Sequence, residues 1–540
     1  MAFVPLIQRL LLPSGGLPAV LALGPVLGAL AALILGGRLG PRSIGCASVL
    51  AGIGLWTASS PSPALASAAL SRPEFERLAF EEDANFAVTV VDDQLRSERT
   101  LLTDDFRATA TGDDYLYMRA LGHVPLLLHP APSQTGVLAF GTGTTAGAVA
   151  LHPEVDSLRI LELSASVLDF APYFEEVNGG VLSDPRVQVL VGDGRRSLGG
   201  MPQGLDVLTM EPLLPDSPFG VYLYTAEFYG TVRRALKPGG LLCQWVPPHA
   251  LRPATFDAVI AAFSGGFSWS GVFLFGTQVL LVGGDREPQL DPARFPASGP
   301  AREALAALGM SEPSGLASRF VCAGWPAAAR PLTDADPWVL FEPKAPGLEV
   351  LGWLPGNLAT LRGREQALPA AWASVCGKAG AERFAGVREL HRAREAFERT
   401  RYRLPGAEGL GDFASHAGRA AAVLGDDPEW LHLARVASFE TRRSEGLGLL
   451  RAGQSRAALS KLLAAAEQRP ERADVHLFVA LAADGAGQQD VALAALGRSL
   501  EQCPRILETR PGRLAVGIGF SPRLVGALKR MTTRSIGNGD

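Results

Sequence analysis

The stretch GVLAFGTG at residues 136–143 predicts the fold of the central part of this chain. It reads as a short apolar strand that opens into a turn containing Gly141 and Gly143, and the next strand ends on Glu162. Glycines let the backbone approach a ligand without a Cβ clash, and an acid about 20 residues on can accept both hydroxyls of a ribose. The pattern therefore predicts a nucleotide site, although Ala139 stands where the fingerprint has its first glycine.

Acidic residues also follow the later strands. Residues 184–191 read as a third strand that leads into Asp193 and Gly194, and residues 205–210 read as a fourth strand that ends at Glu211. Parallel strands that are buried on both faces should carry apolar residues, so acids at three successive strand ends belong to the crevice at the carboxyl edge of the sheet. We expect Asp193 to accept the exocyclic amine of an adenine there.

These pieces occur in the order of a known family. The chain resembles the polyamine aminopropyltransferases, of which spermidine synthase is the familiar member, and more closely their membrane-fused bacterial relatives. The matching segments are Glu162 and residues 184–187, 192–195, 223–229 and 237–240. Upstream, residues 113–117 and 123–125 match the family's D-E-x-x-Y and H-x-P elements, so the resemblance extends over residues 80–290.

The resemblance implies an α/β fold with a class I methyltransferase-like, Rossmann-type sheet. It also implies decarboxylated S-adenosylmethionine or S-adenosylmethionine as a substrate, a polyamine as the acceptor, and no metal. Aminopropyl transfer requires a bound cationic amine that loses a proton before its nitrogen attacks, and carboxylates serve both needs. The implied catalytic residues are Asp216, Glu211, Tyr117 and Asp113, and the implied cofactor-binding residues are Gly141, Gly143, Glu162, Asp193 and Gly194.

The chain departs from the family where the amine should bind. The family's D-x-x-D-P element falls on residues 211–215, where Glu211 keeps the charge of the first position and Leu214 occupies the second, that of the presumed base. Asp216 lies two residues further on and could replace that base, or could only favour a turn between two prolines. The half of the site that should bind adenosine departs less from the family, although Ser164 replaces the second acid of the family's E-V-D element.

Three functions follow from these residues. Asp113 and Tyr117 favour aminopropyl transfer to a polyamine. The apolar pair Leu213 and Leu214 would suit S-adenosylmethionine-dependent methyl transfer to an apolar acceptor. The replacement at Ala139 favours a catalytically degenerate scaffold that only binds the nucleotide.

The N-terminus has the composition of a membrane segment. Residues 17–35 carry no charge and could cross a bilayer, and residues 44–58 are a shorter apolar run, which together indicate a membrane hairpin. The alternative is a signal sequence over residues 42–68. Because S-adenosyl cofactors are cytosolic, we expect an inner (cytoplasmic) membrane protein with its catalytic domain in the cytoplasm, although Arg38 and Arg42 would prefer that side for the connecting loop.

We expect five regions: a membrane anchor over 1–71, a small β-domain over 72–130, a nucleotide-binding domain over 131–290, a linker and closing segment over 291–345, and a helical region over 346–540. An antiparallel hairpin over 272–282 should close the nucleotide-binding sheet. Near 445–505 a 34-residue period resembles tetratricopeptide (TPR) repeats, which could bind a protein partner or only cap the domain.

Composition gives no indication of three other kinds of protein: nucleic-acid-binding, disulfide-stabilised and metal-binding proteins. A formal net charge of −4 gives no basic surface for nucleic acid. The 5 cysteines are scattered without a C-x-x-C, and the 8 histidines form no H-E-x-x-H, so neither a disulfide framework nor a metal site is indicated. We expect His123 to be a packing histidine near the pocket.

Overall fold

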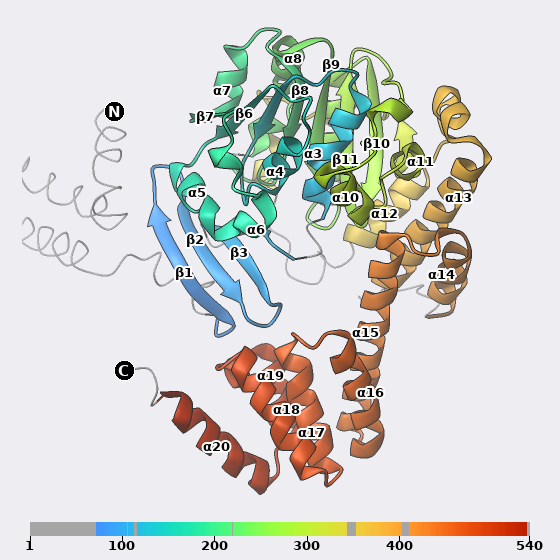
Figure 1. The fold of residues 1–540 in the computed structure, drawn as a ribbon. Coiled ribbons are helices and arrows are strands. Elements are labelled where there is room, and N and C mark those ends of the chain that lie inside the picture. Colours follow the sequence, from blue (N-terminus) through green and yellow to red (C-terminus); the bar gives the residue numbers. More distant parts are fainter. Residues whose placement is uncertain are drawn as a thin grey trace, which may run out of the picture. The chain divides into compact units, whose positions relative to one another are not determined.

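The computed structural model describes residues 72–104, 106–112, 116–218, 220–342, 353–401 and 410–536. These residues fall into two compact units (Figure 1). The first unit consists of the described residues within 1–112, 164–173 and 442–540. The second unit consists of those within 113–163 and 174–441.

The first unit contains a four-stranded antiparallel sheet whose strands are adjacent in chain order (Figure 1). Its strands are β1 (Phe75–Glu82), β2 (Ala87–Asp93), β3 (Glu98–Thr103) and β4 (Phe106–Ala110). Its helices are α5 (Ala165–Asp169), α16 (Ser455–Gln468), α17 (Ala473–Gly485), α18 (Gln489–Gln502), α19 (Arg510–Ile518) and α20 (Pro522–Ile536). Helix α18 repeats the length of α16 one 34-residue period later, which is the period seen in the sequence.

The second unit contains an eight-stranded sheet of order β12-β10-β11-β9-β8-β5-β6-β7. Its strands are β5 (Gln134–Leu138), β6 (Ser157–Glu162), β7 (Val187–Val191), β8 (Leu205–Met210), β9 (Leu236–Val246), β10 (Trp269–Phe275), β11 (Gln278–Gly284) and β12 (Phe320–Ala323). The neighbouring strands β9, β8, β5, β6 and β7 run parallel to one another. The β10–β11 hairpin pairs antiparallel with β9 through β11. The predicted methyltransferase-like sheet is therefore confirmed, including the closing hairpin.

Strand β9 shows why this sheet is apolar on both faces. Leu241, Cys243 and Trp245 pack into an apolar cluster with helix α3 (Tyr117–Leu128). Leu242 and Val246 alternate with them and pack into a second cluster, with helices α8 (Ala226–Ala235) and α9 (Pro253–Gly266). Because successive side chains of a strand point to opposite faces, one strand contributes to both clusters.

The remaining helices of the second unit are α4 (Thr144–Ala150), α6 (Glu175–Asn178), α7 (Gly194–Gly199), α10 (Pro300–Ala307), α11 (Pro313–Ala317), α12 (Trp353–Arg362), α13 (Ala370–Arg401) and α14 (Leu410–Leu424). Helix α15 (Pro428–Arg451) begins in this unit. A buried ion network joins it to the sheet, since the guanidinium of Arg319, 0% exposed, lies 3.2 Å from Asp427 and 2.5 Å from Glu429. The C-terminal part of the chain is thus helical, as expected.

No helix within the described ranges is both long enough and apolar enough to cross a bilayer. The predicted membrane hairpin falls within residues 1–71, which lie outside the described residues.

Candidate functional site

The glycine turn after β5 has the backbone of a nucleotide-binding loop. Ala139, Gly141 and Gly143 have φ angles of 70°, 56° and 79°, all in the left-handed region. A Cβ on Gly143 would lie 2.4 Å from the ring of Phe140, so only glycine fits at this position, directly before α4. The left-handed conformation costs an L-residue about 1 kcal/mol, so Ala139 is strained where the fingerprint has its first glycine.

Glu162 holds this turn in place. It is the last residue of β6 and is 6% exposed, and its Oε2 accepts a hydrogen bond from the backbone N–H of Phe140 at 2.7 Å. Strand β6 lies beside β5, with Leu138 opposite Leu161, so the acid and the turn meet at the carboxyl edge of the sheet. The structure therefore brings Glu162, Gly141 and Gly143 together, and contact between Glu162 and a ribose stays a prediction.

Asp193 and Gly194 begin helix α7 at the same edge. The exposed Asp193 caps this helix by accepting a hydrogen bond from the backbone N–H of Arg196 at 3.1 Å. A Cβ on Gly194 would meet Leu138 at 3.1 Å, so the start of α7 packs against the end of β5. The capping role of Asp193 was missed in the sequence, although an acid before a helix is a known signal for it. Recognition of adenine by Asp193 stays a prediction.

Ser164 stands where the family has a second acid, yet a carboxylate lies beside it. Its hydroxyl donates to Oδ2 of Asp83, from the loop between β1 and β2, at 2.5 Å. The Ser164 oxygen also accepts from the backbone N–H of Val167 and so caps α5. A residue distant in the sequence therefore supplies a carboxylate next to this position.

Tyr117 and Glu211 form a pair beside this crevice. The hydroxyl of Tyr117, the first residue of α3, donates to Oε1 of Glu211, just after β8, at 2.5 Å. The ring of Tyr117 stacks on Trp245 of β9, with the ring centroids 5.4 Å apart and the planes at 12°. The indole N–H of Trp245 donates to Gln278 at 2.9 Å, which fixes the ring. Trp245 was missed in the sequence, because its closeness to Tyr117 depends on the order of the strands.

The setting of Glu211 changes its acidity. Burial raises the pKa of Glu211 from an ordinary value of 4.5 to about 8, and the hydrogen bond from Tyr117 opposes this shift. At neutral pH the carboxyl group therefore holds its proton in the ligand-free protein. A carboxyl group with a pKa close to the working pH is suited to accept and release a proton.

The other predicted catalytic residues are Asp216 and Asp113, and Leu214 stands at the position of the presumed base. Leu214 packs against the apolar cluster that contains Tyr117 and Trp245. Burial raises the pKa of the Tyr224 phenol, and the charges of Glu211 and Asp216 add to this shift, so both acids lie near Tyr224. A base role for Asp216 stays a prediction. Asp113 lies outside the described residues.

Arg195 and Asp334 connect two of the matching sequence segments, 192–195 and 223–229. The guanidinium of Arg195 donates to both carboxylate oxygens of Asp334, at 2.8 and 2.5 Å, and holds the pKa of Asp334 below its usual range. Asp334 also accepts from the hydroxyl of Thr225 at 2.6 Å, and its backbone N–H donates to Glu227 at 2.9 Å. These contacts close the segment around Asp334 against the start of α8, so Arg195 has a structural role.

Arg186, in the segment 184–187, is structural as well. Its guanidinium donates to the carbonyl groups of Ala150, His152 and Val155 at 2.6, 3.1 and 3.1 Å, where it caps the end of α4. Asp184 holds this guanidinium at 2.6 Å. The segment thus fixes the end of the helix that begins at the glycine turn.

His123 is a packing residue, as expected. It is fully buried in α3, and its Nδ1 lies 2.8 Å from Nε2 of His152. Burial lowers the pKa of His123 well below its usual range. Among the residues that the structure describes, no three His, Cys, Asp or Glu side chains are placed to hold a metal ion.

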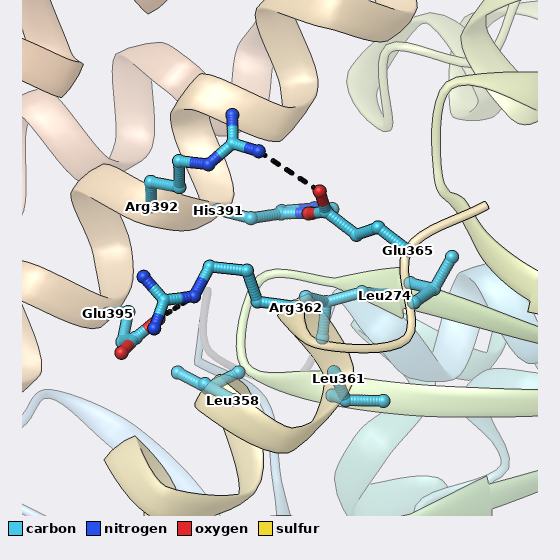
Figure 2. Close-up of a pocket in the computed structure, with 9 residues that line it drawn as sticks. Leu274, Leu358, Leu361, Arg362, Glu365, His391, Arg392 and Glu395 are labelled. Carbon is cyan, nitrogen blue, oxygen red and sulfur yellow. Dashed lines mark hydrogen bonds and ion pairs between the residues drawn. The ribbon is translucent and has the colours of Figure 1, made fainter. Parts of the chain in front are cut away.

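A small cavity lies in the second unit between the sheet and helices α12 and α13 (Figure 2). Its volume of about 10 Å³ is close to the space of one water molecule. Its charged side chains pair with one another, since Arg392 lies 3.1 Å from Glu365 and Arg362 lies 3.4 Å from Glu395. The cavity is too small for a nucleotide or an amine substrate.

Comparison with known proteins finds a domain family that matches part of the chain. Residues 114–265 match the spermine/spermidine synthase domain family. Over 170 residues the chain is 33% identical to a polyamine aminopropyltransferase of Nitrosomonas europaea, which covers 31% of this chain and 52% of that protein. A polyamine aminopropyltransferase of a Ruegeria species is 30% identical over 173 residues, 32% of this chain and 57% of that protein. The chain therefore spans about half the length of these curated relatives.

Among solved structures, a spermidine synthase in complex with the transition-state analogue AdoDATO is similar to this chain at 21% sequence identity. The match covers 41% of this chain and 78% of that chain, with a TM-score of 0.37.

Proposed function

We propose that this protein transfers an aminopropyl group to an amine acceptor, because residues 114–265 match the spermine/spermidine synthase domain family. The donor in this proposal is decarboxylated S-adenosylmethionine. The observation that carries the proposal is the hydrogen bond from Tyr117, whose ring stacks on Trp245, to Glu211, whose backbone N–H bonds to Leu138 just before the glycine turn. The pair combines a carboxyl group that can take a proton with a phenol hydroxyl that orients it.

The chemistry assigns a role to each of these side chains. The acceptor binds as an ammonium ion, whose pKa of about 10 keeps it protonated at neutral pH. Ionised Glu211 takes one proton from it, and the Tyr117 hydroxyl orients the carboxylate. The freed nitrogen attacks the carbon next to the sulfonium, a C–N bond forms, and the C–S bond breaks with its electrons going to sulfur. The products are methylthioadenosine and a secondary amine, which is protonated in turn.

On the donor side, we assign the nucleotide to the crevice at the ends of β5 and β6. In this proposal Gly141 and Gly143 admit the nucleotide to the backbone, and Glu162 accepts hydrogen bonds from its ribose. Asp193 and Gly194 form the adenine side, at the start of α7.

The test is turnover by the purified full-length protein. Incubation with decarboxylated S-adenosylmethionine and a set of amines should release methylthioadenosine, which chromatography with mass spectrometry detects together with the aminopropylated product. Replacing Glu211 with Gln should lower kcat by about 10²–10⁴-fold, the usual contribution of a positioned base. Methyl transfer from intact S-adenosylmethionine would instead establish the methyltransferase alternative. Nucleotide binding without turnover of either donor would establish the scaffold.

Two further proposals concern the ends of the chain. We propose that residues 1–71 anchor the protein in the cytoplasmic membrane with the catalytic domain in the cytoplasm. Native protein should then sediment with membranes and resist carbonate extraction, whereas a chain beginning at Arg72 should not sediment. A mature protein that begins near Ser67 outside the cytoplasm would contradict the anchor.

We also propose that the 34-residue helical repeats, which resemble TPR units, hold a protein partner. Deletion of these repeats should then abolish co-purification of the partner.

A further inference from the structure

We infer that the outer side of the last two helices, α19 and α20, binds the surface of a lipid bilayer that carries anionic headgroups. This basic face belongs to the first unit, whereas the crevice at the ends of β5 and β6 belongs to the second unit, so the inference is independent of the proposed aminopropyl transfer. The basic face consists of the exposed side chains Arg510, Arg513, Arg523, Lys529 and Arg530.

The sequence of these two helices differs in charge from the rest of the chain. Residues 503–536 contain 7 Lys or Arg and a single acid, Glu508, although the whole chain has a formal net charge of −4. The helical segment before them, residues 455–502, contains 5 Lys or Arg and 6 acids. The repeat array therefore has a nearly neutral body and a positively charged end.

The packing of α19 turns its arginines toward solvent. Gly512 and Ala515 are the buried residues of this helix, which packs against α17. Arg510 and Arg513 lie on the opposite side of the helix, one turn apart, and both are exposed. Val516 follows one turn after Arg513 and is 55% exposed. Helix α19 thus presents two arginines and an aliphatic side chain together.

Helix α20 has a similar arrangement. Leu524 and Ala527 are buried, and the helix packs against α18 at the end of the array (Figure 1). Arg523 and Arg530 are both exposed and stand seven residues apart, which is close to two helical turns, so they lie on one side of α20. Only residues 519–521 separate α20 from α19, so the two exposed sides belong to the same end of the array.

The acids near this face leave most of its charge uncompensated. Glu508 pairs with Arg505, 2.6 Å away. The guanidinium of Arg513 donates to the backbone carbonyl of Glu508, a contact that directs the guanidinium and supplies no charge. Arg523 is partly compensated by Asp484 of α17, whose pKa it helps to lower. A partner that supplies several negative charges is therefore the complement of the basic face.

The place of the basic face in the chain favours a lipid surface over an acidic protein. Burial raises the pKa of the Cys503 thiol to about 11, and the charges of Glu74 and Asp93 add to this shift, so the beginning of β1 lies near the start of the basic segment. The apolar runs within residues 1–71 therefore join the unit close to this segment.

The exposed Val516 favours the same partner. In helices that lie at a membrane surface, aliphatic side chains enter the headgroup region while Lys and Arg meet the anionic headgroups. Val516 stands between the arginines of α19 and the connection to α20, as such a helix requires. A soluble acidic protein would be matched by the arginines alone.

The expected contact is weak and reversible. Each Lys or Arg near an anionic membrane contributes about fivefold to the affinity, so five of them contribute roughly a thousandfold. A single acyl chain, with an association constant of about 10⁴ M⁻¹, already gives only marginal binding. The basic face therefore orients a protein that is held at the membrane by residues 1–71 and does not by itself keep the chain there.

Amide hydrogen exchange of the full-length protein, measured by mass spectrometry over residues 510–530, tests the contact. The protein is mixed with vesicles of phosphatidylcholine, with or without about one third phosphatidylglycerol. At 0.1 M salt we expect exchange at the end of α19 to be about fivefold slower or more with phosphatidylglycerol. The difference should be lost at 1 M salt, because the Debye length falls from about 10 Å to about 3 Å.

Two double variants locate the contact. Arg510→Gln with Arg513→Gln should weaken the binding about 25-fold, two losses of fivefold each, and remove most of the protection. Arg456→Gln with Arg498→Gln is the matched control, since both residues are exposed arginines of α16 and α18, and it should keep the protection.

The two kinds of vesicle differ only in charge, so insertion of residues 1–71 into either cannot produce the expected difference. Equal exchange in both overturns the inference, as does protection that survives in Arg510→Gln with Arg513→Gln. Protection by dissolved polyglutamate and by neither kind of vesicle would assign the basic face to an acidic protein instead. The comparison of salt concentrations uses native protein, so it decides the question even if a variant does not fold.

Discussion

Glu211 should make the stability of the second unit depend on pH. Its pKa is raised from 4.5 to about 8, so above pH 4.5 the folded state keeps a proton that the unfolded state has lost. The folded state therefore binds more protons between these values, and stability must fall as the pH rises from 4.5 to 8. One pKa unit corresponds to about 1.4 kcal/mol, which gives an upper limit of about 3 kcal/mol lost at pH 7.

The partial exposure of Glu211 reduces this value, and about half of it is a reasonable expectation. The variant Glu211→Gln keeps the shape and cannot ionise. It should match the native protein at pH 5 and exceed it by about 2 kcal/mol at pH 8. Exposed Glu176→Gln is the control for the Glu-to-Gln change itself.

Urea unfolding at pH 5, 6, 7 and 8, followed by tryptophan fluorescence, measures this difference. Seven of the 8 tryptophans lie between residues 245 and 430, so the signal reports on the second unit. A difference between native protein and Glu211→Gln that stays constant across these pH values would refute the assignment of a raised pKa.

In the kinetic assay, kcat/KM of the native protein should rise with pH up to about 8 and then level off. This rise should be absent in Glu211→Gln.

Three further changes test other parts of the structure. Ala139→Gly should raise the urea midpoint, because glycine adopts the left-handed φ without strain, and a lower midpoint would contradict the strain argument. Glu162→Ala should weaken the binding of methylthioadenosine roughly ten- to a hundredfold, and unchanged affinity in calorimetry would exclude Glu162 from the ribose site. Arg319→Met should destabilise the second unit by about 1.5–3 kcal/mol, because Asp427 and Glu429 would lose their most buried partner and keep Arg383 and Arg394, and a change within about 0.5 kcal/mol in urea unfolding would contradict this.

The sheet could be predicted from the sequence because its signals are local. The strand over residues 205–210 has the predicted bounds, since a mainly apolar run, with Asp206 and Thr209 inside it, precedes the acid that marks the sheet edge. The glycine turn was found for a related reason, because Gly143 is sterically required by Phe140, three residues away. Strand β9 spans Leu236–Val246, because its pairing with β8 continues through the Pro-Gly-Gly turn.

The acceptor side could be predicted only in part. The resemblance pointed to Tyr117 and Glu211, but their contact depends on α3 packing over β8 and β9. Trp245 has no local signal at all, because it reads as one more apolar residue at the end of a strand. In the same way, nothing near Ser164 in the sequence indicates that Asp83 supplies a carboxylate beside it.

The residues that match the family divide into two kinds, and the division limits what the match says about activity. Arg186 caps α4 and Arg195 joins Asp334 to the start of α8, so both would be needed for folding whatever the reaction. The residues that touch a substrate in the proposal lie in the crevice and in the loop after β8, where Glu211 is followed by Leu214. A motif match that includes Arg186 and Arg195 is therefore evidence for the sheet, and the acceptor has to be inferred from the few side chains around Glu211.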